Sequence, residues 1–195
     1  MSQAHALAIL RQHQETVSRL EPLLPAILDF AARLVACLER GRTVLWMGNG
    51  GSAGDAQHLS AELVGRFQRE RPALRSLALS TDTSLMTAVA NDYGFEQIFA
   101  RQLEALAGAG DVVVAISTSG GSKNVCAGAA VARRRGATVV ALTGQGGGAL
   151  AAGCDLLIAV PSPVTARVQE AHILIGHLVC ELVDEHVAAH PQGGH

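Results

Sequence analysis

Residues 43–67 read TVLWMGNGGSAGDAQHLSAELVGRF, and the rest of the chain is organised around them. A short apolar run ends in a glycine cluster, and apolar residues then recur at helical spacing to Phe67. This pattern predicts a strand, a tight turn and a helix. Such a helix starts with unpaired N–H groups that glycines expose to an anion, and Ser52 can either cap the helix or bond the ligand. The stretch therefore predicts an anion site at the start of the helix.

A polar pair lies one turn deeper on the same predicted helix. His58 and Glu62 are four residues apart, so their side chains are neighbours. Gln169 and His177 lie on the last predicted helix and are separated by about 12 Å of helical rise, so they meet at one ion only if both lean toward it or if one belongs to another subunit. Two imidazoles, a carboxylate and an amide oxygen suit zinc or a similar ion. The alternative is an ordinary solvated helix pair.

The composition limits the class of protein. A chain of 195 residues, of which 49% are hydrophobic, can form one domain with a substantial core. A net charge of −2 and a pI of about 6.4 argue against nucleic acid or an anionic membrane as partner. The sequence shows no secretory signal and no apolar run of about 18 residues, so we expect a cytoplasmic location. We interpret the four cysteines as reduced core residues rather than as a catalytic thiol: Cys37, Cys126, Cys154 and Cys180.

The chain divides into an arm, a core and a tail within a single domain spanning residues 1–195. Residues 1–40 have a helical pattern, which Pro22 and Pro25 divide into two helices. This arm packs either on another subunit or as a cap on its own domain. Residues 41–188 form the predicted α/β core, and residues 189–195 a disordered tail.

The core shows five short apolar runs that alternate with helical segments. The predicted strands cover residues 43–47, 76–79, 112–116, 138–142 and 156–160. The helices between and after them end near residues 67, 90, 106, 135 and 187. Buried strands of this kind predict a five-stranded parallel sheet covered on both faces. Ligands of such sheets bind beyond the carboxyl ends of the strands, where the polar loops after Met47, Leu79 and Ile116 would meet.

A second loop suits a phosphate group. Residues 117–122, STSGGS, offer four hydroxyls and two glycines between a strand and a helix, although an ordinary serine turn with a capping serine remains the alternative. No Gly-Lys-Ser/Thr follows these glycines, which argues against a nucleoside triphosphatase. Residues 48–53 fit G-x-G-x-x-A, but Asp82 comes about 30 residues onward instead of about 20, which makes a dinucleotide site the weaker reading.

Taken together, five motifs resemble the phosphoheptose isomerase branch of the sugar-isomerase (SIS) domain family. They are Asn49–Ser52, Asp55–His58 with Glu62, Ala90–Phe95, Ser117–Gly120, and Arg167–His172 with His177. The resemblance covers nearly the whole chain. It implies a flavodoxin-like SIS fold and a homotetramer with sites at subunit interfaces. It also implies conversion of sedoheptulose 7-phosphate to D-glycero-D-manno-heptose 7-phosphate, the first step of ADP- or GDP-heptose biosynthesis for lipopolysaccharide or other surface glycans.

The resemblance also assigns roles to residues. Glu62 would be the general base and His177 the general acid of a ketose–aldose isomerisation through an enediol. One zinc ion per subunit would be held by His58, Glu62, Gln169 and His177. Substrate contacts would come from Asn49, Gly50, Gly51, Ser52, Glu62, Asn91, Asp92, Ser117, Thr118, Ser119, Ser122 and Gln169. Because a carboxylate bound to zinc is a weaker base, the two roles of Glu62 compete.

A second class of function has to be weighed. Some SIS relatives resemble these isomerases but act as tetrameric protein-binding factors, for example with the bacterial replication initiator, and lack the Glu/His pair. This chain has both Glu62 and His177. The sequence therefore favours an enzyme over a non-catalytic adaptor.

Overall fold

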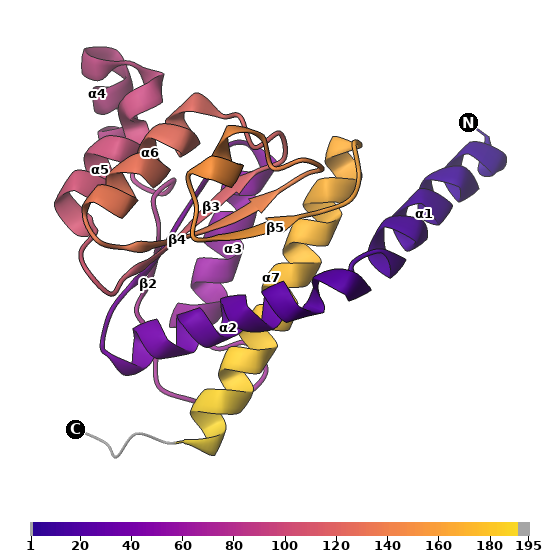
Figure 1. The fold of residues 1–195 in the computed structure, drawn as a ribbon, viewed down its shortest axis with the longest axis horizontal. Coiled ribbons are helices and arrows are strands. Elements are labelled where there is room, and N and C mark those ends of the chain that lie inside the picture. Colours follow the sequence, from indigo (N-terminus) through magenta and orange to yellow (C-terminus); the bar gives the residue numbers. More distant parts are fainter. Residues whose placement is uncertain (1, 191–195) are drawn as a thin grey trace.

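The computed structural model describes residues 2–190 and forms three layers, with a parallel sheet between two groups of helices (Figure 1). The strands are β1 (Val44–Gly48), β2 (Ser76–Ala78), β3 (Val112–Ser117), β4 (Thr138–Thr143) and β5 (Leu156–Ala159). The helices are α1 (Gln3–Ser18), α2 (Leu24–Glu39), α3 (Gly51–Val64), α4 (Thr83–Tyr93), α5 (Ile98–Leu106), α6 (Lys123–Arg134) and α7 (Thr165–Ala189). Three 3₁₀ turns complete the fold: η1 (Glu21–Leu23), η2 (Phe95–Gln97) and η3 (Gly148–Ala152). Of the predicted tail, residues 191–195 lie outside the described residues.

The sheet confirms the predicted α/β class. Its five strands are all parallel and run in the order β2-β1-β3-β4-β5, with Trp46 opposite Ala78 on one side and Val114 on the other. The strand order reverses between β1 and β3, so the loops that follow these two strands border the topological switch point. That is where the glycine cluster and the serine loop both lie.

Alternate residues of each strand feed two separate cores. Val44 and Trp46 face α2, α3 and α7, whereas Leu45 and Met47 face α4, α5 and α6. This is the pattern of a sheet with helices on both faces. The prediction of a second buried strand is wrong in one respect: β2 is an edge strand, and its Leu77 is 40% exposed.

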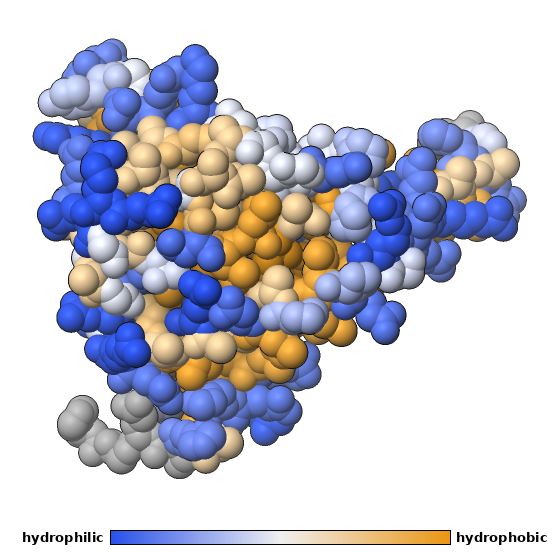
Figure 2. Space-filling model, in the orientation of Figure 1, coloured by the Kyte–Doolittle hydropathy of each residue, from blue (hydrophilic) through white to orange (hydrophobic). Residues whose placement is uncertain are grey.

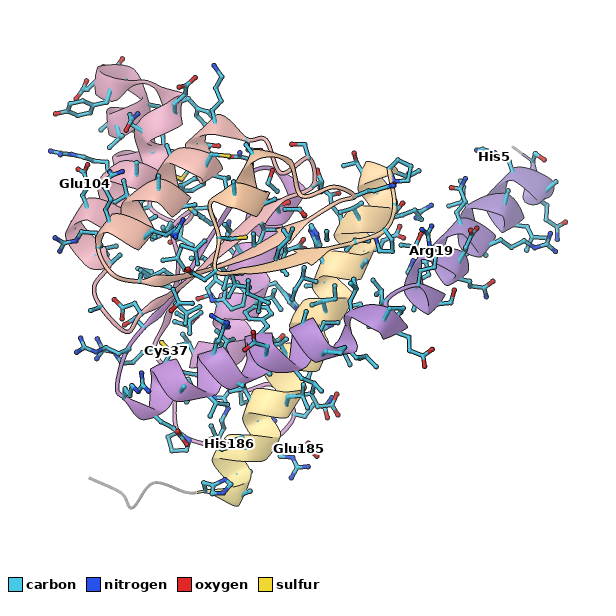
Figure 3. All side chains as sticks on the ribbon, viewed as in Figure 1. His5, Arg19, Cys37, Glu104, Glu185 and His186 are labelled. Carbon is cyan, nitrogen blue, oxygen red and sulfur yellow. The ribbon has the colours of Figure 1, made fainter. Side chains whose placement is uncertain are left out.

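The N-terminal arm has two different halves. Pro22 and Pro25 lie at the break between α1 and α2, as predicted. Helix α2 packs on α7 and on the sheet, where Phe30 makes an edge contact with Trp46 at 6.3 Å between ring centroids, so this half is a cap on its own domain. Helix α1 instead extends from the body (Figure 1), and Thr16 is its one buried residue. His5 and Arg19 mark its two ends in Figure 3.

Two boundaries differ from prediction around the central helix. α3 starts at Gly51 with Gly50 as its N-cap, so Ser52 lies in the first turn and does not cap it. α3 ends at Val64, with Gly65 as C-cap, so Phe67 belongs to the following loop and not to the helix. Among the described residues, no helix is long and apolar enough to cross a membrane.

Candidate active site

The start of α3 is free of side-chain caps. Gly50 has φ +55°, a conformation that favours glycine, and no described side chain accepts a hydrogen bond from the first turn. Gly51 is packed so tightly against Gln169 of α7 that a Cβ would lie 2.6 Å from its Nε2 atom. Ser52 is buried directly behind Gly48. The helix therefore presents its backbone N–H groups, and its positive dipole end, toward the switch point.

An amide pair joins the two polar loops. The Asn49 side chain donates from Nδ2 to Oδ1 of Asn124, and Asn124 donates back from Nδ2 to Oδ1 of Asn49, each at 2.8 Å. Asn124 is buried at the start of α6, and its Oδ1 also accepts the Val125 N–H at 2.9 Å. Asn49, expected to contact a substrate, thus has its side chain engaged by a residue that the sequence analysis did not single out.

The serine loop after β3 is stabilised by hydrogen bonds within it. Ser117 and Ser122 hydroxyls lie 2.9 Å apart, and the Ser119 hydroxyl accepts the Gly121 N–H at 3.2 Å. Ser122 occupies the N-cap position of α6 without making a side-chain cap, so the capping-serine reading of this loop is wrong. Thr118 and Ser119 also line a cavity of about 340 Å³ that reaches the first turn of α7 at Thr165.

Asn91 and Asp92 lie apart from these loops. Both are exposed in the last turn of α4, where the Asn91 Nδ2 donates to the Asp92 Oδ1 at 2.8 Å. In Figure 1, α4 is at the outer end of the helical layer that also contains α5 and α6. Their side chains remain available to solvent or to a second molecule.

Three ligand-type side chains converge between α3 and α7. The Nε2 atoms of His58 and His177 are 2.9 Å apart, and His58 Nε2 lies 3.3 Å from Glu62 Oε1. Donor atoms of all three residues lie within 4.8 Å of one another. The helices approach closely because Gly176 faces Leu59, where an added Cβ would come within 2.4 Å of a Leu59 methyl carbon. A glycine next to His177 thus brings two distant segments to one point.

This donor set fits a divalent cation. Ligands about 2.0–2.2 Å from a tetrahedral ion are separated from each other by about 3.3 Å, close to the separations found here. Two imidazoles with one carboxylate are also a common catalytic zinc set that leaves a position open. Gln169 is at a different level, since its amide packs on Gly51 in the first turn of α3, whereas His58 is two turns further along.

Burial shifts the pKa of one polar group on α3 and of one on α7. Burial raises the pKa of Asp55 to about 6, an effect that the charge of His58 partly opposes, and the Asp55 Oδ2 has no partner among the described residues. His172 is buried on α7, and its Nε2 donates to the Thr143 carbonyl at 3.0 Å. Burial lowers the pKa of His172 to about 4, which keeps the ring neutral.

The cysteines offer no nucleophile. All four are free thiols, of which Cys37 and Cys180 are buried. Burial raises the pKa of Cys37 to about 11 and that of Cys180 to about 12, so both remain protonated near neutral pH. Cys126 and Cys154 are partly buried, and burial raises the pKa of each of them as well.

Sequence reasoning missed the residues that fix the far end of α3. The Arg71 side chain, in the loop between α3 and β2, is 1% exposed and pairs with Asp184 of α7, which is equally buried. Phe67 stacks on the His177 ring with 5.4 Å between centroids. One signal was available: Asp184 follows the apolar residues Val179, Cys180 and Val183 on the core face of α7, where a carboxylate needs a partner.

Known proteins resemble the chain over nearly its full length. The family model for the SIS domain matches residues 10–144. A phosphoheptose isomerase of Geobacter metallireducens is 54% identical over 177 residues, which are 90% of this chain and 94% of that protein. One from Campylobacter concisus is 52% identical, again over 90% of this chain and 93% of that protein.

Solved structures agree with these relatives. The phosphoheptose isomerase of Neisseria gonorrhoeae superposes with a TM-score of 0.89 at 42% identity, covering 94% of this chain and 98% of that one. That of Francisella tularensis gives a TM-score of 0.91 at 38% identity, covering 95% and 100%. On this likeness in both sequence and fold, the chain belongs to the phosphoheptose isomerase family of SIS-domain enzymes.

Proposed function

We propose that this protein converts sedoheptulose 7-phosphate to D-glycero-D-manno-heptose 7-phosphate. The reaction would take place in the cytoplasm, as the first step of ADP- or GDP-heptose synthesis for lipopolysaccharide or another surface glycan. The observation that carries the proposal is the spacing of two sites along α3. Uncapped N–H groups lie at its start, and the cluster of His58, Glu62 and His177 lies two to three turns further on.

This spacing suits a long, extended sugar phosphate. From Gln169, beside the first turn of α3, to His177 the rise along α7 is about 12 Å. An extended chain of eight single bonds, as from C1 to the phosphorus of a heptulose 7-phosphate, spans about 10 Å at the advance per bond of an extended backbone. A phosphate at the start of α3 would therefore leave C1 and C2 beside Glu62 and His177.

The serine loop would hold the phosphate together with the start of α3. The hydroxyls of Ser117 and Ser122 lie 2.9 Å apart in this loop, and the Ser119 hydroxyl accepts the Gly121 N–H. The loop follows β3, which borders the topological switch point together with β1 and the start of α3. Hydroxyls and backbone N–H groups are the donors that phosphate oxygens accept. Further contacts are proposed from Asn49, Gly50, Gly51, Ser52, Asn91, Asp92, Thr118 and Gln169.

Glu62 and His177 would carry the proton transfers. Glu62 would remove a proton from C1 while the carbonyl oxygen at C2 gains one, which gives an enediol. A proton returned to C2, and loss of the proton from the C1 hydroxyl, then give the aldose. His177 would supply the returning proton as general acid. Phe67 covers one face of the His177 ring and limits the orientations open to it.

His58, Glu62 and His177 would also hold one zinc ion per subunit. Their converging donor atoms support this, and Gln169 is proposed as a fourth ligand once its side chain turns from Gly51 toward the cluster. A divalent ion in this place would polarise the oxygens at C1 and C2 of the substrate.

A homotetramer would complete the sites. The His58 side chain is 49% exposed, and the apolar residues Val64 on α3 and Leu178 on α7 are 45% and 36% exposed. Apolar residues also gather on the outer face over α2 (Figure 2), where Leu24 and Leu28 are 44% and 54% exposed. Contiguous apolar surface of this kind is typical of subunit interfaces.

The test is turnover of the heptulose phosphate in deuterium oxide. Proton transfer through an enediol exchanges with solvent, so NMR should show the aldose with deuterium at C2. A five-carbon ketose phosphate serves as the control, because it is too short to reach from the phosphate site to Glu62. Absence of heptose phosphate formation with zinc supplied would refute the proposal.

A further inference from the structure

We infer that Arg71 and Asp184 are positioning residues for the isomerisation, because together they hold the backbone of Glu62 at a fixed distance from His177. The inference rests on the proposed roles of these two residues. In the described residues, neither Arg71 nor Asp184 makes a hydrogen bond or ion pair with the side chains of the metal-type cluster of His58, Glu62 and His177. Their effect would pass through the two helices that bear Glu62 and His177.

The Arg71 guanidinium binds the end of α3 directly. Its Nη2 donates to the Glu62 carbonyl at 2.7 Å, and its Nη1 donates to the Leu63 carbonyl at 2.9 Å and to the Pro72 carbonyl at 3.1 Å. The last carbonyls of a helix have no partners within it. Arg71 therefore caps α3 at the turn that carries Glu62, in place of a residue that follows the helix directly.

The same guanidinium binds α7. Arg71 Nε donates to Asp184 Oδ1 at 2.5 Å, and both side chains are 1% exposed. Asp184 comes seven residues, or two turns, after His177, so it lies on the same face of α7. One planar side chain thus links the backbone of Glu62 to the helix of His177.

Asp184 adds a second link through the loop between α3 and β2. Its Oδ2 accepts the N–H groups of Gln68 at 2.9 Å and of Arg69 at 3.1 Å. These residues follow Phe67, whose ring stacks on His177. Burial by itself would raise the pKa of Asp184, but the hydrogen bonds from Arg71 and from these N–H groups lower it, so the carboxylate stays charged.

Stability alone does not call for this arrangement. A buried ion pair is often no more stabilising than apolar side chains of similar volume. A lysine would supply the same charge, but only the fork of an arginine can reach a carboxylate and two successive carbonyls at once. The geometry therefore points to a role in fixing the positions of α3 and α7.

The test replaces the pair with apolar residues, as in the double variant Arg71→Met/Asp184→Leu. The matched control is Arg69→Met/Glu185→Leu, because that neighbouring pair is 3.6 Å apart and more than half exposed; Glu185 is labelled on the lower half of α7 in Figure 3. We expect the first variant to fold but to melt at a lower temperature than wild type, because the Glu62 carbonyl and the N–H groups of Gln68 and Arg69 lose their side-chain partners. Its kcat should fall by about 10- to 100-fold, the usual loss when a ligand-orienting group is removed.

Two further readouts separate positioning from general damage. KM should stay within about threefold of wild type, because the phosphate site at the other end of α3 is untouched. Cobalt(II) titrated into the metal-free protein should bind about 10- to 100-fold more weakly to the first variant and unchanged to the control. Unchanged kcat and cobalt affinity in a folded first variant would overturn the inference.

If that variant fails to fold, Arg71→Lys decides the matter, since it keeps the charge beside Asp184 but loses the carbonyl contacts. Arg71→Lys with wild-type kcat and cobalt affinity overturns the inference; loss of both with normal KM supports it. Wild-type protein that binds cobalt but does not isomerise the heptulose phosphate refutes the proposed function alone, and the cobalt titration still decides the positioning role. If the wild-type protein neither binds cobalt nor isomerises the heptulose phosphate, both the proposed function and the positioning role are refuted.

Discussion

The two ends of α3 differ in how their backbone polar groups are satisfied. At the first end, no side chain caps the backbone N–H groups, and the fit of Gly51 against Gln169 leaves no room for a side chain there. At the second end, the carbonyls of Glu62 and Leu63 are capped by a buried guanidinium. A helix has a positive start and a negative end, so the first can receive an anion without help and the second accepts a cation. The start of α3 is therefore suited to bind an anion, and its end is suited to keep the side chains near it in fixed positions.

The largest expected effect tests whether proton transfer takes place near the second end of α3, where Glu62 lies. Glu62→Gln and His177→Gln should each lower kcat by about 10²- to 10⁴-fold with little change in KM, because each removes a proton-transfer group and leaves the phosphate site intact. The double variant should be little worse than the poorer single one, since both groups serve one transition state. Steady-state kinetics on metal-loaded protein checks this, and near-normal turnover by either single variant would contradict the assignment.

The same two variants test whether a site spans two subunits. Co-refolding them should restore some activity if Glu62 of one subunit works with His177 of another. Within one chain, however, the Nε2 atom of His177 already lies 2.9 Å from that of His58. His58 is one helical turn from Glu62. We therefore expect no recovery at any mixing ratio, with mixed oligomers confirmed by mass.

Metal binding at the second end gives the next largest effect. His58→Ala should lose most of the one divalent ion expected per subunit, because His58 Nε2 faces both His177 and Glu62. Elemental analysis of protein purified without chelator measures the metal content. Gln169→Ala is the informative companion: it should lose less metal if this side chain stays on Gly51. Wild type that is fully active without metal would reject the site.

Variants of the serine loop test whether the phosphate binds near the first end of α3. Ser119→Ala and Ser122→Ala should each raise KM by about 10- to 150-fold, the equivalent of about 1.5 to 3 kcal/mol for a hydrogen bond to a charged group. Turnover at saturation should change much less, since the cluster of His58, Glu62 and His177 is remote. Thr165→Ala, on the far side of the adjoining cavity, is the control. Unchanged KM in both serine variants would place the phosphate elsewhere.

How far the sequence predicts this molecule depends on whether local pattern or tertiary packing decides each feature. The five strands, the division of the arm at Pro22 and Pro25, and the loops at the switch point follow from local apolar periodicity and from glycine and proline positions. The end of α3 at Val64 did not follow, because apolar spacing continues to Phe67 while the capping guanidinium comes from Arg71. Gly65 offered a local stop signal, since glycine is common directly after a helix, but the guanidinium that caps the Glu62 and Leu63 carbonyls left none.

The candidate site divides in the same way. His58 and Glu62 are recognisable as neighbours from their spacing, but nothing in the spacing tells that Gly176 lets α7 approach until His177 joins them. The engagement of Asn49 by Asn124 is equally invisible, since the two residues are 75 positions apart. Gln169 was grouped with His177 on its donor type and on the resemblance, but helical rise separates the two residues by about 12 Å.

The smallest effect expected concerns Asp55, about one turn from the start of α3. Its pKa rises from 3.8 to about 6 on folding, chiefly through burial, so the folded chain binds more protons than the unfolded chain between these values. Stability contributed by the protonated carboxyl is therefore complete below about pH 4 and lost as the pH rises through 6. Asp55→Asn removes this loss. The variant should melt at a higher temperature than wild type at pH 7, and the difference should shrink toward zero by about pH 4.

Wild type and Asp55→Asn are compared at each pH, so that the titration of other groups cancels. His172 ionises in an overlapping range with the opposite sign, because burial lowers its pKa to about 4, but it does so equally in both proteins. Asp29→Asn serves as the control, since that carboxylate is 45% exposed and paired with Arg33 on α2, and its removal should give no gain at pH 7. A gain for Asp55→Asn that is the same at pH 4 and pH 7 would show that packing, and not the charge of a desolvated carboxylate, is what the substitution changes.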